Sequence, residues 1–339
     1  MKKVNLSEIK AKVEEIFVKE GLSKEDAATI TEILSDAEMK GLKTHGYVRV
    51  KKYVDCIRSG GIKPSGNITI TSDSPSRCMV DGEGGLGILI ANKAVDIAIK
   101  KAKETGIGIV NVKNSHHLGA VGYYAAKCAD EKMFCMAMSN GDIMLAATGS
   151  KEKNIGNNPF AYAVPAGKYD KIIYDVAISM GSDMKIIQME KNGEKVPAGW
   201  MINKDGVPSD NPSDYLAGGV LLPFGGYKGY GLALMVEMFA GVLSESATTK
   251  DVHAWNSVAG TSGNVGHFFM VINPEKMGNP DAYEKRIESI IDDIKGSQLA
   301  AGADKIYYPG EKELIAIKEC MDSGEVSVDE DVLAQIMAM

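Results

Sequence analysis

The sequence predicts an α/β protein with a helical N-terminal region. In the first sixty residues, apolar side chains recur at helical spacing. From Asp81 onward, short apolar strands alternate with amphipathic helices, an order typical of crossover units. The length of 339 residues, against about 150 for a usual domain, indicates two domains or one large core with an appended region. The composition, 45% hydrophobic and 24% charged, is typical of a folded globular chain.

The N-terminal region divides into three predicted helices. The first has one apolar stripe and ends near Gly21, a residue type that favours helix C-termini. Ser23 and Asp26 have the spacing of a capping pair, which predicts the start of the second helix. A third helical pattern runs from Tyr47 to about Ile57, before a Ser-Gly-Gly run. The stripe of the first helix consists of Leu6, Ile9, Val13, Ile16 and Phe17.

The rest of the chain carries alternating strand and helix signals. A strand at 108–112, a helix at 120–130 and a strand at 134–138 predict a crossover unit. Asp205-Gly206 marks a turn. The other predicted strands are 67–71, 77–80, 161–165, 172–178 and 267–272. The other predicted helices are 88–102, 229–243, 282–294 and 311–321.

Charge, cysteines and hydropathy exclude several classes of protein. The net charge is −7, and basic residues alternate with acidic ones rather than forming a stripe, which argues against nucleic acid as a partner. The five cysteines are widely spaced and include no CxxC pair, so neither a disulfide framework nor a four-thiolate zinc site is indicated. Because no apolar run reaches the roughly eighteen residues of a membrane span, we expect no membrane insertion and place the protein in the cytoplasm.

The stretch 82–87, GEGGLG, matches GxGxxG between a predicted strand and a predicted helix. A dinucleotide-binding interpretation would place a pyrophosphate at the N-terminus of that helix. The corresponding fold also needs an acidic residue at the end of its second strand to hold the ribose, and Glu104 lies before that strand. A glycine-rich turn is therefore the favoured interpretation.

The second glycine-rich stretch, FGGYKGYG at 224–231, contains Lys228 at the start of a predicted helix. It is not a phosphate-binding P-loop, because Gly229 follows the lysine where that motif has Ser or Thr. Glycines let the backbone approach a ligand, and a lysine at a helix start is a suitable charge for a phosphate or a ribose hydroxyl. A solvated surface lysine beside a flexible loop is the alternative.

Two adjacent histidines are candidates for acid–base chemistry. His116 and His117 follow the predicted strand 108–112, at the carboxyl edge where open α/β sheets bind ligands. Side chains of adjacent residues diverge, so we expect one histidine to face a site as acid or base and the other to be structural. His253 and His267 have no such neighbours and are expected to be structural.

A second candidate combines His45 with Arg49. On a helix these two residues would share a face, with Tyr53 one turn further. An imidazole and a guanidinium could then converge on a small acid, with the guanidinium binding its carboxylate through two hydrogen bonds. A helix-terminal histidine beside a solvated arginine is the alternative. The histidines lack the HxxxH spacing of two metal ligands on one helical face, so no metal site is expected.

Short motifs follow one another along nearly the whole chain. They are THG at 44–46 with Arg49, DG at 81–82 leading to Gly87, NSHHLG at 114–119, GNNP at 156–159, DVA at 175–177, GYKGYG at 226–231 and YPGE at 308–311. In this order they resemble the malate/L-lactate dehydrogenases of the second, non-Rossmann type. That family also includes ureidoglycolate dehydrogenase, sulfolactate dehydrogenase, diketogulonate reductase and a cyclic imino-acid reductase.

The resemblance implies an NAD- or NADP-dependent oxidoreductase whose fold, built on a mixed sheet, differs from the doubly wound dinucleotide-binding sheet. It also implies a homodimer with the active site near the subunit boundary. In that family the position matching His117, and in some accounts the position matching His45, is assigned the acid–base role, and the GxGxxG match is no cofactor site. The positions matching Arg49, Tyr53 and Asn157 lie at the substrate. Cofactor contacts map onto Gly141, Asp175, Val176, Ala177, Lys228, Pro309, Gly310 and Glu311.

Three regions are expected on this basis. Residues 1–75 form a helical N-terminal region, 76–299 the α/β core that binds cofactor and substrate, and 300–339 a segment that returns to the N-terminal region. Two departures from the family pattern bear on specificity. Asn157 places an amide where many relatives have a threonine hydroxyl, and Asp183 stands where many relatives have an aromatic or basic residue and a glycine. An Asp183 that faced the adenosine ribose would repel the 2′-phosphate of NADP.

The expected reaction is hydride transfer between nicotinamide and C2 of a small 2-hydroxy or 2-oxo acid of the malate or lactate type. Ureidoglycolate, sulfolactate, diketogulonate and a cyclic imino acid are alternative substrates within the family. A non-catalytic relative that binds a small molecule is the alternative from a different functional class.

Overall fold

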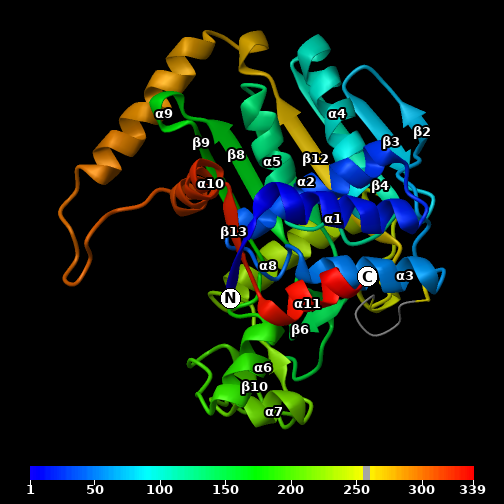
Figure 1. Ribbon diagram of the computed structural model, residues 1–339. Coiled ribbons are helices and arrows are strands. Elements are labelled where there is room, and N and C mark those ends of the chain that lie inside the picture. The colour runs from blue at the N-terminus through cyan, green and yellow to red at the C-terminus, as the bar shows by residue number, and fades with distance from the viewer. Residues whose placement is uncertain (255–259) are drawn as a thin grey trace.

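The computed structural model describes residues 1–254 and 260–339, and its centre is a seven-stranded sheet with helices on both faces (Figure 1). β3 and β4 are parallel, and the other neighbouring pairs of this sheet are antiparallel. The sheet is therefore mixed, as predicted, and not doubly wound. In spatial order its strands are β2 (Thr69–Asp73), β3 (Arg77–Asp81), β4 (Ile107–Ser115), β12 (Val265–Ile272), β5 (Phe134–Ser139), β8 (Phe160–Pro165) and β9 (Lys171–Val176).

The predicted crossover unit is present, with one strand inserted into it. β4 continues through α5 (Val121–Asp130) to β5. β12 pairs antiparallel with both β4 and β5, so these two strands point the same way. Local sequence patterns predict the unit itself, but they carry no information about a partner strand from much later in the chain.

Successive residues of the strands face opposite sides of the sheet. Phe269 packs in the main core under α4 (Gly87–Thr105) and α5. Its neighbour Phe268 packs against α8 (Tyr227–Val236) and the π-helix η2 (Glu237–Val242) on the other side. The predicted helix 229–243 is thus present, but its second half winds as a π-helix.

The N-terminal helices are α1 (Leu6–Lys19), α2 (Lys24–Met39) and α3 (Val48–Arg58). The hydroxyl of Ser23 accepts a hydrogen bond from the Asp26 backbone N–H at 3.1 Å, which confirms the predicted cap of α2. The apolar stripe predicted for the first helix is buried in the main core.

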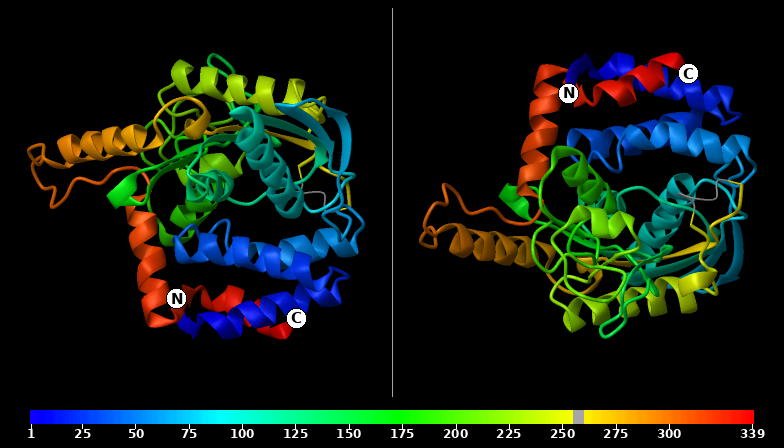
Figure 2. Two further views of the ribbon diagram at one scale, coloured as in Figure 1. Left: turned by 90° about the horizontal axis from the view of Figure 1, so that it is seen from above. Right: turned by 90° about the horizontal axis from the view of Figure 1, so that it is seen from below.

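The C-terminal elements return to these helices (Figure 2). β13 (Glu325–Val328) pairs antiparallel with β1 (Lys2–Asn5). α10 (Glu311–Ser323) contacts α2, and α11 (Glu330–Ala338) contacts α1 and α3. A division of the chain at residue 75 would cut the β2–β3 hairpin, and one apolar core continues from the N-terminal helices into the main sheet.

A second, smaller sheet lies below the main sheet in the view of Figure 1. It has its own apolar cluster and is flanked by α6 (Asp183–Asn192) and α7 (Pro212–Leu216). Its strands were not predicted, because elements of two or three residues are too short to show a period. They are β10 (Met201–Ile202), β11 (Val220–Leu221), β6 (Ile143–Leu145) and β7 (Ile155–Gly156).

Helix α9 (Pro280–Lys295) projects from the body, and a long loop leads from it back to α10 (Figure 2). Three single-turn 3-10 helices complete the described elements. They cover Gly167–Tyr169, Thr249–Asp251 and Pro274–Lys276.

One edge of the main sheet collects loops from distant parts of the chain. β4, β5 and β9 end at this edge, and β8 and β12 begin there, as the pairings of Val265 with Ser115 and of Phe160 with Val176 show. The loops at this edge are 116–119, 140–142, 157–159, 177–179 and 263–264. Five of the residues predicted to bind substrate or cofactor lie in these loops or just before them: Gly141, Asn157, Asp175, Val176 and Ala177.

The GxGxxG loop at 82–87 is a turn, as favoured by the sequence. Its backbone N–H groups are occupied by carbonyl oxygens of the protein: Gly82 donates to Lys113 and Gly84 to Asn114, both at 2.8 Å. Donors that already have partners cannot form a pyrophosphate site. Gly87 is required for a different reason, because a Cβ atom there would lie 2.0 Å from the backbone oxygen of His116.

Replacing Gly87 with alanine should therefore destabilise the protein by about 1–3 kcal/mol, the usual cost of overpacking. Thermal unfolding followed by circular dichroism measures this. The matched control is Gly231→Ala in α8, where a Cβ atom would meet no heavy atom within 4 Å. That variant should be unchanged or more stable by up to about 1 kcal/mol, because alanine favours helix. Equal melting temperatures for the two variants would contradict the explanation.

Candidate active site

The rings of His45 and His117 meet at the loop-bearing edge of the main sheet. Their centroids are 5.7 Å apart and their planes differ by 16°, so the imidazoles are stacked. Tyr53 lies beside them, with its ring 6.0 Å from that of His117. The structure thus brings together three residues that the sequence predicted for one site.

Thr44 connects His45 with Arg49. Its hydroxyl lies 2.9 Å from Nδ1 of His45, and its backbone oxygen accepts a hydrogen bond from Nε of Arg49 at 2.6 Å. Because α3 begins only at Val48, His45 lies in the preceding turn and not on the helix. The expected convergence is present, but shared contacts with Thr44 produce it rather than one helical face.

His116 and His117 diverge, as expected for adjacent residues. His116 is buried, and its Nδ1 accepts a hydrogen bond from the backbone N–H of His117 at 2.9 Å. His117 is half-buried and faces His45. His267 is fully buried between the hydroxyls of Ser139 and Ser115, at 2.9 and 2.8 Å. His267 is therefore structural, whereas His253 is exposed.

Tyr53 is oriented toward His117. Its side chain is fully buried, and its hydroxyl lies 2.7 Å from Nδ1 of His117 and 3.3 Å from the backbone oxygen of the same residue. When Nδ1 carries a proton, the Tyr53 hydroxyl can therefore accept a hydrogen bond from it and donate its own proton to the carbonyl oxygen. When Nδ1 carries no proton, it accepts from Tyr53 and from the Gly119 N–H at 3.3 Å. Tyr53 thus supports both protonation states of His117.

Burial and positive charge favour the neutral form of both stacked histidines. Burial lowers the pKa of His45 to about 4, and the charge of Arg49 contributes in the same direction. The pKa of His117 is held well below its usual range, first by burial and then by Arg49 and His45. Near neutral pH both imidazoles are consequently proton acceptors.

Arg49 has carboxylates in its neighbourhood. Burial lowers the pKa of the half-buried guanidinium, and the nearby charges of Asp183 and Asp142 oppose this lowering. Asp183 therefore acts on the predicted substrate arginine. Asn157 lies in the neighbouring loop, where its amide oxygen accepts a hydrogen bond from the Ser179 N–H at 3.1 Å. Its Nδ2 group is the part that remains for a ligand.

Four of the predicted cofactor contacts line one cavity of about 230 Å³. They are Asp175, Val176, Pro309 and Gly310. The first of them accepts a hydrogen bond from the Gly122 N–H at 2.8 Å, and burial raises its pKa to about 6. Gly122, near the start of α5, was not identified from the sequence. Ala177, which follows these residues in the chain, is exposed.

Glu311 has a different environment from the other predicted cofactor residues. Its buried carboxylate forms ion pairs with Lys295 at 2.7 Å and with Lys305 at 2.9 Å. It also accepts a hydrogen bond from the Tyr308 N–H at 3.3 Å. The carboxylate therefore fixes the turn that carries Pro309 and Gly310. This role depends on lysines in α9 and in the loop that follows it, which no local motif reveals.

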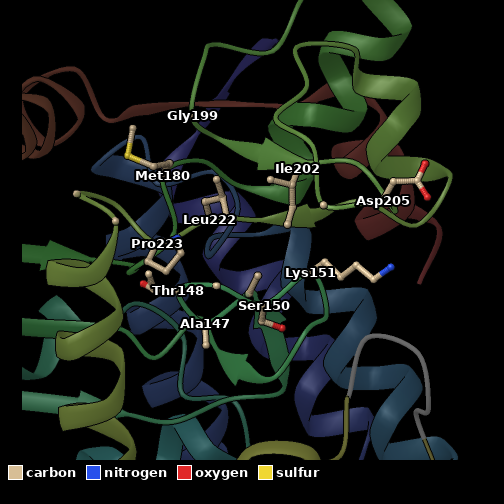
Figure 3. A pocket seen from close by; sticks show the side chains of 15 residues that line it. Ala147, Thr148, Ser150, Lys151, Met180, Gly199, Ile202, Asp205, Leu222 and Pro223 are labelled. Carbon is tan, nitrogen blue, oxygen red and sulfur yellow. The ribbon is translucent and has the colours of Figure 1, made fainter.

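A larger cavity, of about 720 Å³, lies between the small sheet and the start of α8 (Figure 3). Gly225 and Gly226 line it, and Lys228 follows them as an exposed residue of α8. Lys151 and Asp205 lie on one side of the cavity in Figure 3. The sequence predicts the turn at Asp205-Gly206, but not that this turn and the loop 146–151 line a cavity, although Gly149 was a further usable turn signal.

Comparison with known proteins agrees with this arrangement. The family model described as malate/L-lactate dehydrogenase matches residues 4–337. Malate dehydrogenase of Pyrococcus abyssi is 37% identical over 316 residues, which cover 91% of this chain and 86% of that protein. Ureidoglycolate dehydrogenase (NAD(+)) of Escherichia coli is 28% identical over 319 residues, or 94% and 90% of the two chains. The structure of sulfolactate dehydrogenase from Methanocaldococcus jannaschii superposes with a TM-score of 0.93 at 32% identity, covering 99% and 95%.

The electrostatic link between Arg49 and the stacked histidines can be measured directly. In Arg49→Met the pKa of His45 should rise from about 4 toward the usual 6.5 without reaching it, because burial remains. His117 should shift in the same direction. Histidine NMR titration of the ligand-free protein measures both values. Arg49→Lys keeps the charge and is the matched control, with low pKa values expected. Unchanged titration in Arg49→Met would contradict the link.

Proposed function

Because this chain belongs to the malate/L-lactate dehydrogenase family, we propose that the His117–His45–Arg49 arrangement is the active site of its reaction. The protein is an NAD- or NADP-dependent oxidoreductase of small 2-hydroxy acids. The single observation that carries the site assignment is the stacking of two neutral imidazoles beside one guanidinium. We propose a substrate of the malate or lactate type.

Arg49 binds the carboxylate of the substrate. Its Nε is fixed by the backbone oxygen of Thr44, so the two terminal nitrogens are held in one orientation. A planar guanidinium can bind a carboxylate through two parallel hydrogen bonds, which fixes C2 relative to the imidazoles. Asn157 lies at the same substrate, with Nδ2 as its donor.

His117 transfers the proton at the C2 oxygen. In the oxidation of the alcohol, Nε2 of the neutral imidazole accepts the hydroxyl proton, while Nδ1–H donates a hydrogen bond to the Tyr53 hydroxyl throughout. In the reduction of the ketone, the imidazolium returns this proton. His45, stacked on His117, orients the same oxygen or shares the proton. The nicotinamide, when bound, supplies the hydride chemistry.

The substrate itself assists protonation in the reductive direction. In the free protein, Arg49 lowers the pKa of both histidines. A carboxylate bound to Arg49 compensates this positive charge, so the pKa values of His117 and His45 rise when a 2-oxo acid binds. The imidazolium that reduction requires is therefore favoured only in the complex with substrate.

The residues at the sheet edge fit a dinucleotide. Asp175 uses one oxygen for the Gly122 N–H, which leaves the other available for a ribose hydroxyl. A Cβ atom at Gly141 would meet no heavy atom within 4 Å, so this position is open to a ligand. We propose that Gly141, Asp175, Val176, Ala177, Pro309 and Gly310 hold the cofactor, with Lys228 at a phosphate and Glu311 fixing the 308–310 turn. Acidic Asp175 favours NAD over NADP, whereas Asp183 acts on Arg49.

We propose that two copies of the chain form a homodimer, as the resemblance implies. The support is a row of exposed apolar side chains on α8, η2 and the residue that follows. They are Leu232, Leu234, Met238, Val242 and Leu243. Within residues 1–254 and 260–339, no helix has the length and apolar character needed to cross a bilayer. The five cysteines are free, which agrees with the cytoplasm as the proposed location.

Purified protein with a reduced nicotinamide and a panel of acids tests the function. Absorbance of the reduced nicotinamide should fall with oxaloacetate, pyruvate or sulfopyruvate, and faster with NADH than with NADPH. Reaction with a cyclic imino acid alone would identify an imine reductase instead. Binding of NADH without turnover of any acid would identify a non-catalytic relative.

Replacing His117 with alanine should lower turnover about 10²–10⁴-fold, the usual size of an acid–base contribution. His253→Ala is the matched control, because that histidine is exposed. Circular dichroism checks that both variants are folded. Turnover of His117→Ala at the parent rate would contradict the assignment.

A further inference from the structure

Glu237 is a buried carboxylate that the proposed mechanism does not use. It begins the π-helix η2 and is 1% exposed. Among the ion pairs of residues 1–254 and 260–339, none includes Glu237. Burial of a carboxylate without a cation is costly unless N–H donors satisfy it.

Three N–H donors from three separate segments satisfy this carboxylate. Oε1 accepts hydrogen bonds from the backbone N–H of Thr249 at 2.8 Å and from Nδ2 of Asn140 at 3.3 Å. Oε2 accepts from Nδ2 of Asn158 at 2.7 Å. Both asparagines are buried as well.

The two asparagines directly precede or follow residues of the proposed site. Asn140 precedes Gly141, the expected cofactor contact, and Asn158 follows Asn157, the expected substrate contact. Asn140 also accepts a hydrogen bond from the Gly266 N–H at 2.9 Å, which fastens the end of β5 to β12. Glu237 thus connects the cofactor loop at Gly141 with the substrate loop at Asn157 through buried hydrogen bonds.

Asn158 depends strongly on this contact. Its backbone has a φ of 37°, in the left-handed region that residues other than glycine adopt uncommonly. Nδ2 donates to Glu237 and to the Ala233 backbone oxygen, whereas Oδ1 has no partner within the part of the chain that the structure describes. The side chain is therefore held through Nδ2 alone.

We infer that Glu237 is a positioning residue that sets the distance between the cofactor loop at Gly141 and the substrate loop at Asn157. This role rests on the proposed function, which assigns those two loops their ligands. Glu237 is the first residue of a π-helix, a feature common at functional sites. Loss of its carboxylate should misplace the two ligands relative to each other.

Exchanging the donor and the acceptor tests this role. In Glu237→Gln one of the three N–H donors faces an amide N–H, so kcat should fall and the KM for NADH and for the acid should rise, by about 10- to 100-fold overall in kcat/KM. Asn158→Asp places a second carboxylate against that of Glu237, and the repulsion between them should have at least as large an effect. In the double variant the introduced amide donates to the introduced carboxylate, so kcat/KM should recover about tenfold over Asn158→Asp alone.

Asn273→Ala is the matched control for a loss of stability alone. Asn273 is also buried, and its side chain caps the 3-10 helix that follows β12, at the end of that strand away from the site. This variant should melt at a lower temperature but keep the parent kcat and KM. Comparing variants at temperatures well below each melting point separates positioning from stability.

Two measurements do not depend on turnover. NADH affinity, from fluorescence titration, should weaken in Glu237→Gln and recover in the double variant. Hydrogen exchange of the ligand-free protein should accelerate in peptides covering 140–142 and 156–159 in Glu237→Gln, and not in Asn273→Ala. If the parent protein turned over no acid, the proposed function would fail, and exchange would still decide the role of Glu237. Parent-like exchange and NADH affinity in Glu237→Gln, or a double variant no better than Asn158→Asp, would overturn the inference.

Discussion

The site depends on one constraint: two imidazoles are buried beside a fixed positive charge. His45 and His117 stack at 5.7 Å, and Arg49 opposes their protonation. Such a pair stays neutral only while the surrounding loops keep solvent away and hold the guanidinium in place. Thr44 does the latter through its backbone oxygen, and Tyr53 gives His117 a partner in either protonation state. A single anionic ligand can then change the proton affinity of the whole group.

The mixed sheet makes this arrangement possible. A sheet with strands of both directions has strand ends and strand starts at the same edge, so one edge can carry loops from very different parts of the sequence. Here the loop with His117 follows β4, Asn157 precedes β8, and Asp175 lies at the end of β9. The buried carboxylate of Glu237 supports the Asn157 loop and the neighbouring loop 140–142.

The sequence predicted the helices and strands of the fold better than it predicted which of them lie side by side. The capping pair at Ser23 and the main helices and strands have strong local signals, and the structure contains them. The insertion of β12 between β4 and β5 has no local signal, because pairing partners are not encoded in periodicity. Motif order indicated that His45, Arg49 and His117 belong to one site. The contacts of Tyr53 with His117 and of Glu311 with Lys295 have no local signal and are visible only in the structure.

The central place of β12 has a consequence for how the protein is made. While the ribosome is still adding residues before 265, β4 and β5 have emerged with a vacant slot between them, and both strands expose unpaired backbone groups along it. The nascent chain therefore cannot finish its sheet until most of the polypeptide has been synthesised. During that interval the unpaired strand edges are sites at which the growing chain can aggregate.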